Sequence, residues 1–226
     1  MLKRTLVLST AIGLFALSPA ADAGHMSKWY AGIEAGANWS ADADMEVDTT
    51  DPVFGGGWPS SGASFDTGWG GMATVGYAWP QWRVELELGL RKNDFDSFTG
   101  PPGFLGTGDM EHFSQMINII RDFDIGSDCN LSLGAGIGGD SVSVTDSLHV
   151  PTLDGDDYVM AWQLMAGISH ELKPGLDLVL NYRYFNANGP DITETDALAR
   201  LHNSTYDSLS EHTLTIGLRF DLSPSP

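Results

Sequence analysis

The segment formed by residues 213–220 constrains the fold of this chain more than any other feature. Apolar side chains occupy every second position in it, and small or polar side chains occupy the positions between. The apolar set consists of Leu214, Ile216, Leu218 and Phe220. Alternation with a period of two predicts a β-strand that has one apolar face and one polar face.

Seven further segments show the same alternation. They cover residues 29–39, 69–79, 82–91, 113–123, 131–139, 159–170 and 176–185. Segment 113–123 is the least regular, because Ile120 falls among its polar positions and Arg121 among its apolar ones. The eight segments together predict an all-β chain.

Short and long connections alternate between these segments. Three links are short, at residues 80–81, 124–130 and 171–175, and four are long, at residues 40–68, 92–112, 140–158 and 186–211. Short turns at one end and long loops at the other, on an even number of strands, are typical of outer-membrane barrels. We therefore expect an eight-stranded antiparallel up-and-down transmembrane β-barrel over residues 24–222, with both termini in the periplasm.

The two ends of the chain are expected to lie outside the barrel. Lys3 and Arg4 precede an apolar run at residues 6–17, and residues 21–23 have the small-x-small pattern of a cleavage site. This arrangement predicts a secretory signal peptide at residues 1–23. Residues 223–226 are expected to form a short Pro/Ser tail.

Alternation alone leaves open which face of the strands meets water. A soluble barrel or sandwich with its apolar face inward is the rival interpretation. The polar face is rich in glycine, which suits a narrow lumen. Aromatic residues on the apolar face gather near the strand ends, as in an interfacial girdle. This predicted girdle consists of Trp29, Tyr77, Trp79 and Trp82 near the short turns, and Trp39, Trp69, Tyr182 and Tyr184 near the long loops.

Nine charged residues fall on the polar face and are expected to point into the lumen. Unpaired charges there would be costly, so they should pair with one another. Arginine at every basic position suits bidentate pairing with carboxylates. Two interpretations of the lumen are compatible with these charges. One is a plugged barrel, and the other is a narrow conduit that opens when the ion pairs exchange partners. The nine residues are Glu34, Arg83, Glu85, Glu87, Arg91, Asp122, Asp177, Arg183 and Arg219.

Several short motifs, in their order and spacing, resemble the OmpA-like and opacity-type eight-stranded outer-membrane proteins. They are WYAG at 29–32, RVELELG at 83–89, MIN at 116–118, GAGIG at 134–138, AWQ at 161–163, YRY at 182–184 and GLRF at 217–220. Thr215, Gly217, Leu218 and Phe220 resemble the signal that the barrel-assembly machinery recognises. The resemblance implies that this machinery, outer-membrane lipid and lipopolysaccharide are partners. No peptidoglycan-binding domain follows the barrel region, so cell-wall tethering is not expected.

Charge and composition narrow the function further. The formal net charge of −19 argues against nucleic-acid binding. Acidic residues concentrate at 42–51 and 154–157 and are expected to be solvated loops; the alternative is divalent-cation binding that bridges to lipopolysaccharide phosphates. The lone Cys129 is expected to be a bystander thiol. No cofactor and no metal site are predicted.

The sequence offers a few candidate catalytic residues for a lipid-A-modifying enzyme. Asp140–Ser141, His149, His212 and residues 202–204 are located in or near the long links, but none resembles a complete signature. His112 and His170 are interpreted as interfacial residues. We expect a monomeric, non-enzymatic protein that supports envelope integrity and contacts host or surface ligands through acidic extracellular loops. A narrow channel for ions or small solutes is the alternative, and a lipid-A-modifying enzyme is a weaker one.

Overall fold

A computed structural model of the chain describes residues 28–49, 58–99, 108–126, 128–146, 153–195 and 201–222. The predicted signal peptide at 1–23 and the predicted tail at 223–226 are outside the described residues. No helix in the described ranges is long and apolar enough to cross a membrane.

The described ranges contain twelve antiparallel strands: β1 (Lys28–Ser40), β2 (Ala43–Thr49), β3 (Trp58–Phe65), β4 (Gly68–Trp79), β5 (Trp82–Thr99), β6 (Gly108–Asp124), β7 (Cys129–Asp146), β8 (Leu153–Lys173), β9 (Leu176–Ala187), β10 (Asp191–Thr195), β11 (Leu201–Tyr206) and β12 (Leu209–Asp221).

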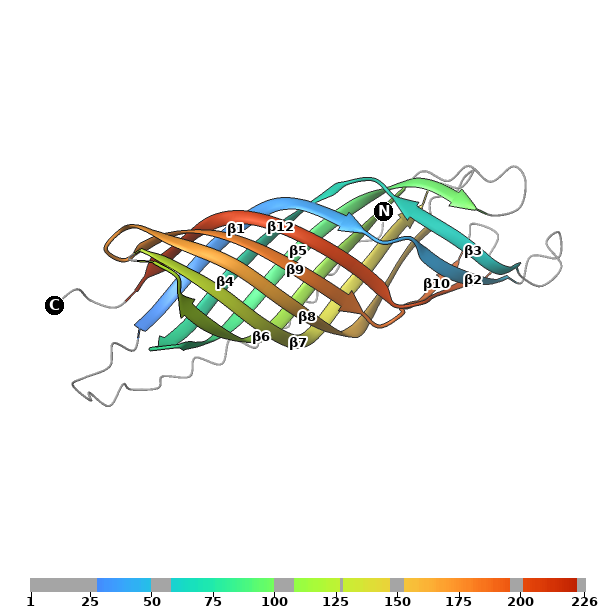
Figure 1. The fold of residues 1–226 in the computed structure, drawn as a ribbon. Coiled ribbons are helices and arrows are strands. Elements are labelled where there is room, and N and C mark those ends of the chain that lie inside the picture. The colour runs from blue at the N-terminus through green and yellow to red at the C-terminus, as the bar shows by residue number, and fades with distance from the viewer. Residues whose placement is uncertain are drawn as a thin grey trace, which may run out of the picture.

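Eight of these strands form a closed barrel of tilted strands (Figure 1). The order around the barrel is β1, β4, β5, β6, β7, β8, β9 and β12. The first and last strands close it, with a register that runs from Tyr30 opposite Asp221 to Ser40 opposite Glu211. The predicted eight-stranded barrel is confirmed. Closure pairs both edges of each of the eight barrel strands, which hydrocarbon surroundings require.

The expectation that the four long links are plain loops is wrong. Strands β5, β6, β7 and β8 continue well beyond the segments predicted from alternation, and β2, β3, β10 and β11 lie within the links. Strand β3 pairs with β5, β2 pairs with β3 and β11, and β10 pairs with β11. The barrel wall is therefore extended at this end by a second sheet region, which we call the raised sheet (Figure 1).

The opposite end of the barrel, which we call the short-turn end, carries the three tight connections. Strand β1 begins there and strand β12 ends there. Pro174 and Gly175 join β8 to β9, and Gly175 has a φ of 79°, a conformation that favours glycine. The carbonyl of Gly175 accepts a 2.9 Å hydrogen bond from the backbone N–H of Asp221, which ties this turn to the end of the last strand.

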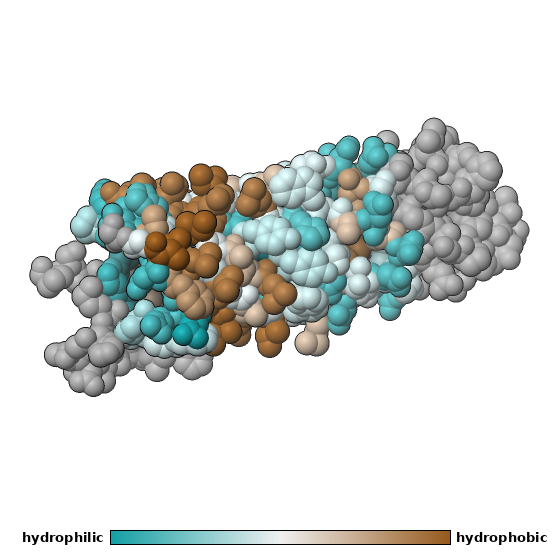
Figure 2. Space-filling model, in the orientation of Figure 1, coloured by the Kyte–Doolittle hydropathy of each residue, from teal (hydrophilic) through white to brown (hydrophobic). Residues whose placement is uncertain are grey.

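The apolar face of the strands points outward. Ile33, Leu86 and Ile137 keep 59%, 57% and 66% of their surface exposed although they are in the middle of their strands. On the face shown in Figure 2, hydrophobic side chains gather over the barrel toward the short-turn end, and hydrophilic ones lie beyond them at both ends. Aliphatic side chains exposed over a continuous band indicate contact with lipid rather than with water. The soluble alternative is therefore wrong.

Candidate functional site

The lumen contains layers of ion pairs, and one of them surrounds Arg183. Its guanidinium donates to Glu34 over 2.9 Å and to Glu87 over 3.0 Å. The Thr215 hydroxyl donates to Glu34 over 2.6 Å, and the Asn181 amide donates to it over 2.8 Å. The side chains of Arg183, Glu34 and Glu87 are at most 7% exposed, so water does not screen these pairs.

A second layer surrounds Arg83 toward the short-turn end. Arg83 donates to Glu85 and to Asp122, each over 2.7 Å. The Tyr30 hydroxyl donates to Glu85 over 2.6 Å, and the Ser132 hydroxyl donates to Asp122 over 2.6 Å. Each carboxylate in this layer thus accepts hydrogen bonds from an arginine and from a hydroxyl group.

A third pair, closer to the barrel rim, joins Arg219 and Asp177. The guanidinium approaches the carboxylate to 2.6 Å and also donates to Ser169 over 3.3 Å. These side chains are more exposed than those of the deeper layers, at 16% and 26%. The pair therefore contributes less to stability than the buried pairs at Arg83 and Arg183.

The remaining predicted inward residue, Arg91, belongs to a layer that the sequence interpretation missed. Arg91 lies 3.5 Å from Glu211, and His112 Nδ1 lies 2.6 Å from Asp140 Oδ2. His112 is 1% exposed inside the lumen, so its interpretation as an interfacial residue is wrong. Asp140 is likewise fully buried in β7 and is not at the membrane surface. Both positions continue the inward parity of their strands, so extending the alternation by one or two residues would have found them.

The Arg91 layer is less completely hydrogen-bonded than the Arg183 layer. Four of its buried polar atoms have no hydrogen-bond partner in the described part of the chain: Arg91 Nη2, His112 Nε2, Asp140 Oδ1 and Glu211 Oε2. In the Arg183 layer this is true of one atom, Gln163 Oε1, on a side chain whose amide nitrogen donates to Glu87 over 3.0 Å. With Asp140 and Glu211 added to the five predicted acids, the described lumen holds seven carboxylates and four arginines. The interior is therefore more acidic than the sequence interpretation expected.

Above the Arg91 layer, on the side of the raised sheet, the interior becomes apolar. Phe185, Met110, Val142 and Leu209 are at most 1% exposed and belong to one hydrophobic cluster. Ala43 on β2 and Tyr206 on β11 join this cluster from the raised sheet. The extra strands form there because they bury apolar side chains, as the strands of a soluble protein do. This core covers the polar layers from the raised-sheet side.

The lumen contains a small cavity of about 30 Å³ on the short-turn side of the Arg183 layer. Arg83, Arg183, Arg219 and Glu34 are among the residues that line it. A volume of this size holds only one or two waters. The cavity therefore lies between the ion pairs of the Arg83, Arg183 and Arg219 layers.

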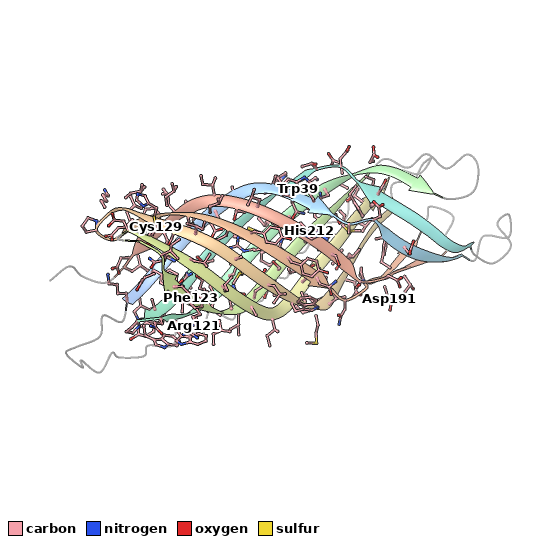
Figure 3. All side chains as sticks on the ribbon, viewed as in Figure 1. Trp39, Arg121, Phe123, Cys129, Asp191 and His212 are labelled. Carbon is pink, nitrogen blue, oxygen red and sulfur yellow. The ribbon has the colours of Figure 1, made fainter. Side chains whose placement is uncertain are left out.

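The residues of the predicted girdle lie on the outer surface near the two ends of the barrel wall. Trp79 pairs in register with Trp82 at the short-turn end, and Trp39 pairs with His212 at the other end. His212, which we expected in or near a loop, is part of β12 (Figure 3). The Tyr182 hydroxyl and His212 Nδ1 are 2.7 Å apart, so this part of the surface is both aromatic and hydrogen-bonded. Among the predicted assembly residues, Thr215 is buried in the lumen and Phe220 is exposed.

Cys129 has a neighbour that the sequence interpretation did not anticipate. Its Sγ lies 3.3 Å from Nδ1 of His170 on the adjacent strand β8. Cys129 itself lies near the short-turn end of the barrel (Figure 3). In the described part of the chain, no group of three or more His, Cys, Asp or Glu residues is arranged to hold a metal ion. The Cys129–His170 contact is therefore a pair without a third ligand among these residues.

A closed antiparallel barrel with an apolar outer band and an ion-paired lumen defines an outer-membrane barrel protein. The family model for the outer membrane protein beta-barrel domain matches residues 7–220. The chain belongs to this family, as the resemblance to OmpA-like proteins implied, and the family places it in the outer membrane of Gram-negative bacteria.

Solved structures show the same fold. Neisserial surface protein A (NspA) is 18% identical, with a TM-score of 0.54 over 88% of this chain and 99% of that one. A major outer membrane protein from Thermus thermophilus is 12% identical, with a TM-score of 0.57 over 87% and 99%. The outer membrane protease OmpT from Escherichia coli is 10% identical, with a TM-score of 0.51 over 86% and 97%. No curated protein sequence matches the chain.

Proposed function

We propose that this protein is a closed, non-conducting outer-membrane barrel that presents the raised sheet outside the cell as an acidic contact surface. Its role would be structural and surface-interactive, supporting the envelope and contacting surface ligands. The observation that carries this proposal is the filled lumen. Buried ion-pair layers at Arg183 and Arg91 are covered by an apolar core, and the cavity holds about 30 Å³.

The charge on the raised sheet supports a contact role and indicates the chemistry of the ligand. Exposed carboxylates on or next to the raised sheet are at Asp42, Asp44, Asp94 and Asp96, and a further one, Asp156, is on β8 opposite Ser143 of β7. The one described lysine of this region, Lys92, is already bonded to Asp109 and Glu111. A ligand with positive charge, such as a basic polypeptide or a divalent cation bridged to lipopolysaccharide phosphate, would complement this surface. The orientation with both termini in the periplasm is part of this proposal.

Single-channel recording of the refolded protein in a planar bilayer tests the closed lumen. Insertion is verified independently by heat-modifiable gel migration. We expect an inserted protein without discrete openings, because buried side chains of the Arg91 layer and of the apolar core fill this part of the lumen among the described residues. Reproducible openings would instead support the alternative function, a narrow channel for ions or small solutes, in which the lumen pairs exchange partners.

Binding of a fluorescent oligolysine peptide to proteoliposomes tests the contact surface. The variant Asp94→Asn/Asp96→Asn removes two exposed carboxylates from the part of β5 that borders the raised sheet. A matched control, Asp124→Asn/Glu171→Gln, removes exposed carboxylates from the short-turn end. We expect salt-sensitive binding that weakens in the first variant and not in the control. Equal binding by both variants would contradict the proposal.

A non-enzymatic role is also part of this proposal. The His112–Asp140 pair has the geometry of a base and its orienting group, yet both side chains are buried beneath the apolar core. A substrate therefore cannot reach the pair without opening that core. Altered lipid A on overexpression, abolished by Ser141→Ala or Ser204→Ala, would support the enzyme alternative instead.

A further inference from the structure

Arg121 differs from every other arginine in the described barrel strands. Arg83, Arg91, Arg183 and Arg219 point into the lumen, and each has a carboxylate within 3.5 Å. Arg121 lies on β6 at a position whose neighbours along the strand, Ile119 and Phe123, face outward. No carboxylate of the described residues forms an ion pair with it. Its charge is therefore exposed on the outward surface without a counter-charge from the described residues.

Two aromatic rings hold the Arg121 guanidinium in place. Its central carbon lies 5.4 Å from the Trp82 ring centroid and 5.1 Å from the Phe123 ring centroid. Trp82 lies directly opposite Arg121 in the register between β5 and β6. A cation within about 6 Å of an aromatic ring is attracted by the electrons of the ring face. The rings thus restrict the guanidinium while leaving its N–H groups free to donate.

The surroundings of Arg121 mark the border of the apolar band at the short-turn end. Leu133 lies opposite Arg121 on β7, and Trp79 lies opposite Trp82 in the adjacent hairpin. Arg121 and Phe123 lie together on the outer side of the barrel near this end (Figure 3). Phosphate groups of membrane lipids lie at this border, directly beyond the acyl chains. A guanidinium matches phosphate with two parallel hydrogen bonds.

We propose that Arg121, held by Trp82 and Phe123, is a binding site for the phosphate of a glycerophospholipid at the short-turn end of the barrel. The lipid is assigned to the periplasmic leaflet on the basis of the proposed orientation. The acyl chains of the lipid pack against the neighbouring outward side chains of β6 and β7, including Ile119 and Leu133. This contact fixes the depth of the barrel in the membrane, since a charge bonded to lipid phosphate resists displacement into hydrocarbon.

The test uses the refolded protein in maltoside micelles, which contain no phosphate. Phosphatidylglycerol with short acyl chains is added, and native mass spectrometry measures the dissociation constant of the tightest-bound lipid. Arg121→Gln should weaken this binding about tenfold, the change that corresponds to the loss of one charge-assisted contact. Trp82→Leu should weaken it less, because the charge remains and only the aromatic support is lost.

Lys28→Gln is the matched control. Lys28 is also a cation at the short-turn end, but it already forms a 3.1 Å ion pair with Asp221. We expect the control to bind phosphatidylglycerol as the unmodified protein does. Equal binding by Arg121→Gln and the unmodified protein would overturn the proposal, as would an equal loss in Arg121→Gln and Lys28→Gln.

Two further probes identify the ligand. Diacylglycerol, which lacks phosphate, should bind equally to Arg121→Gln and to the unmodified protein. Glycerol 3-phosphate should not displace the lipid; displacement would show a general anion site and overturn the lipid assignment.

Folding of each variant is checked by heat-modifiable gel migration. If Arg121→Gln does not fold, Arg121→Lys and Trp82→Leu are compared with the unmodified protein, and unchanged lipid binding in both would count against the site. Binding in micelles depends neither on conductance nor on orientation, so its outcome is independent of the proposed function.

Discussion

Arg91 lies over the ring of Phe185 inside the lumen, with its guanidinium carbon 4.0 Å from the ring centroid. This contact joins the polar layer that contains Glu211 to the apolar core on the raised-sheet side. The stacking accommodates a buried cation whose Nη2 has no hydrogen-bond partner among the described residues. The transition from polar to apolar filling in the lumen therefore occurs at this pair.

Replacement of Phe185 tests that junction. Phe185→Ala removes a fully buried ring and leaves a cavity beside an incompletely bonded arginine. We expect the free energy of unfolding in urea, measured in vesicles, to fall by about 3–5 kcal/mol. Met160→Ala, at a position that is 68% exposed, is the control and should change it little. A loss at Phe185 no larger than at Met160 would contradict the packing described here.

Arg183 is the second test, because it bonds to two carboxylates at once. Arg183→Met leaves Glu34 and Glu87 buried without a counter-charge, and we expect a loss of about 3–5 kcal/mol in the free energy of unfolding. Adding Glu34→Gln and Glu87→Gln to this variant should restore part of the loss, since neutral side chains need no counter-charge. Lys92→Met, which removes the two partly exposed ion pairs with Asp109 and Glu111, is the control and should have a small effect. Stability that stays unchanged in Arg183→Met would rule out a buried network.

The last strand provides a steric test. A Cβ atom at Gly217 would collide with the carbonyl oxygen of Ile33 and lie 2.7 Å from the Cα of Glu34 on β1. Because backbone atoms cannot yield as side chains do, Gly217→Ala should lower the free energy of unfolding by about 1–3 kcal/mol. At Gly71 the nearest atoms to an added Cβ are 3.7 Å away, so Gly71→Ala should be tolerated. The two variants are compared by the temperature at which heat-modifiable migration is lost.

The predicted aromatic girdle can be located by fluorescence quenching with brominated lipids. Variants that retain either Trp39 or Trp79 as the sole tryptophan should be quenched most by lipids brominated near the headgroup. A third variant carries Ile33→Trp and no other tryptophan. Its tryptophan is in the middle of the outward face of β1, where 59% of the isoleucine is exposed. That variant should be quenched most by bromines deep in the acyl chains. If the Ile33→Trp variant were quenched most by lipids brominated near the headgroup, the membrane would lie elsewhere on the barrel.

The strands of the barrel wall and their two faces can be predicted from the amino-acid sequence. Alternation along residues 82–91 and 213–220 defines a strand and its two faces locally, because successive side chains in a strand point to opposite sides. The same rule placed Arg83, Arg183 and Glu87 on the inward face without knowledge of their partners. The alternation continues past two predicted strand boundaries, at His112 and Asp140. The inward position of these two residues could therefore have been predicted from the same pattern.

The contacts between these side chains depend on the closed fold and cannot be predicted from the alternation. Arg183 bonds to Glu34, which is 149 residues away, and to Glu87, which is 96 residues away, because the stagger of the closed barrel brings those positions to one level. The raised sheet depends likewise on pairing between distant segments, such as β2 with β11. Register and stagger are properties of the whole closed sheet, whereas alternation is a property of each strand. For this reason the sequence predicted the inward charges, and the fold alone assigned their pairs.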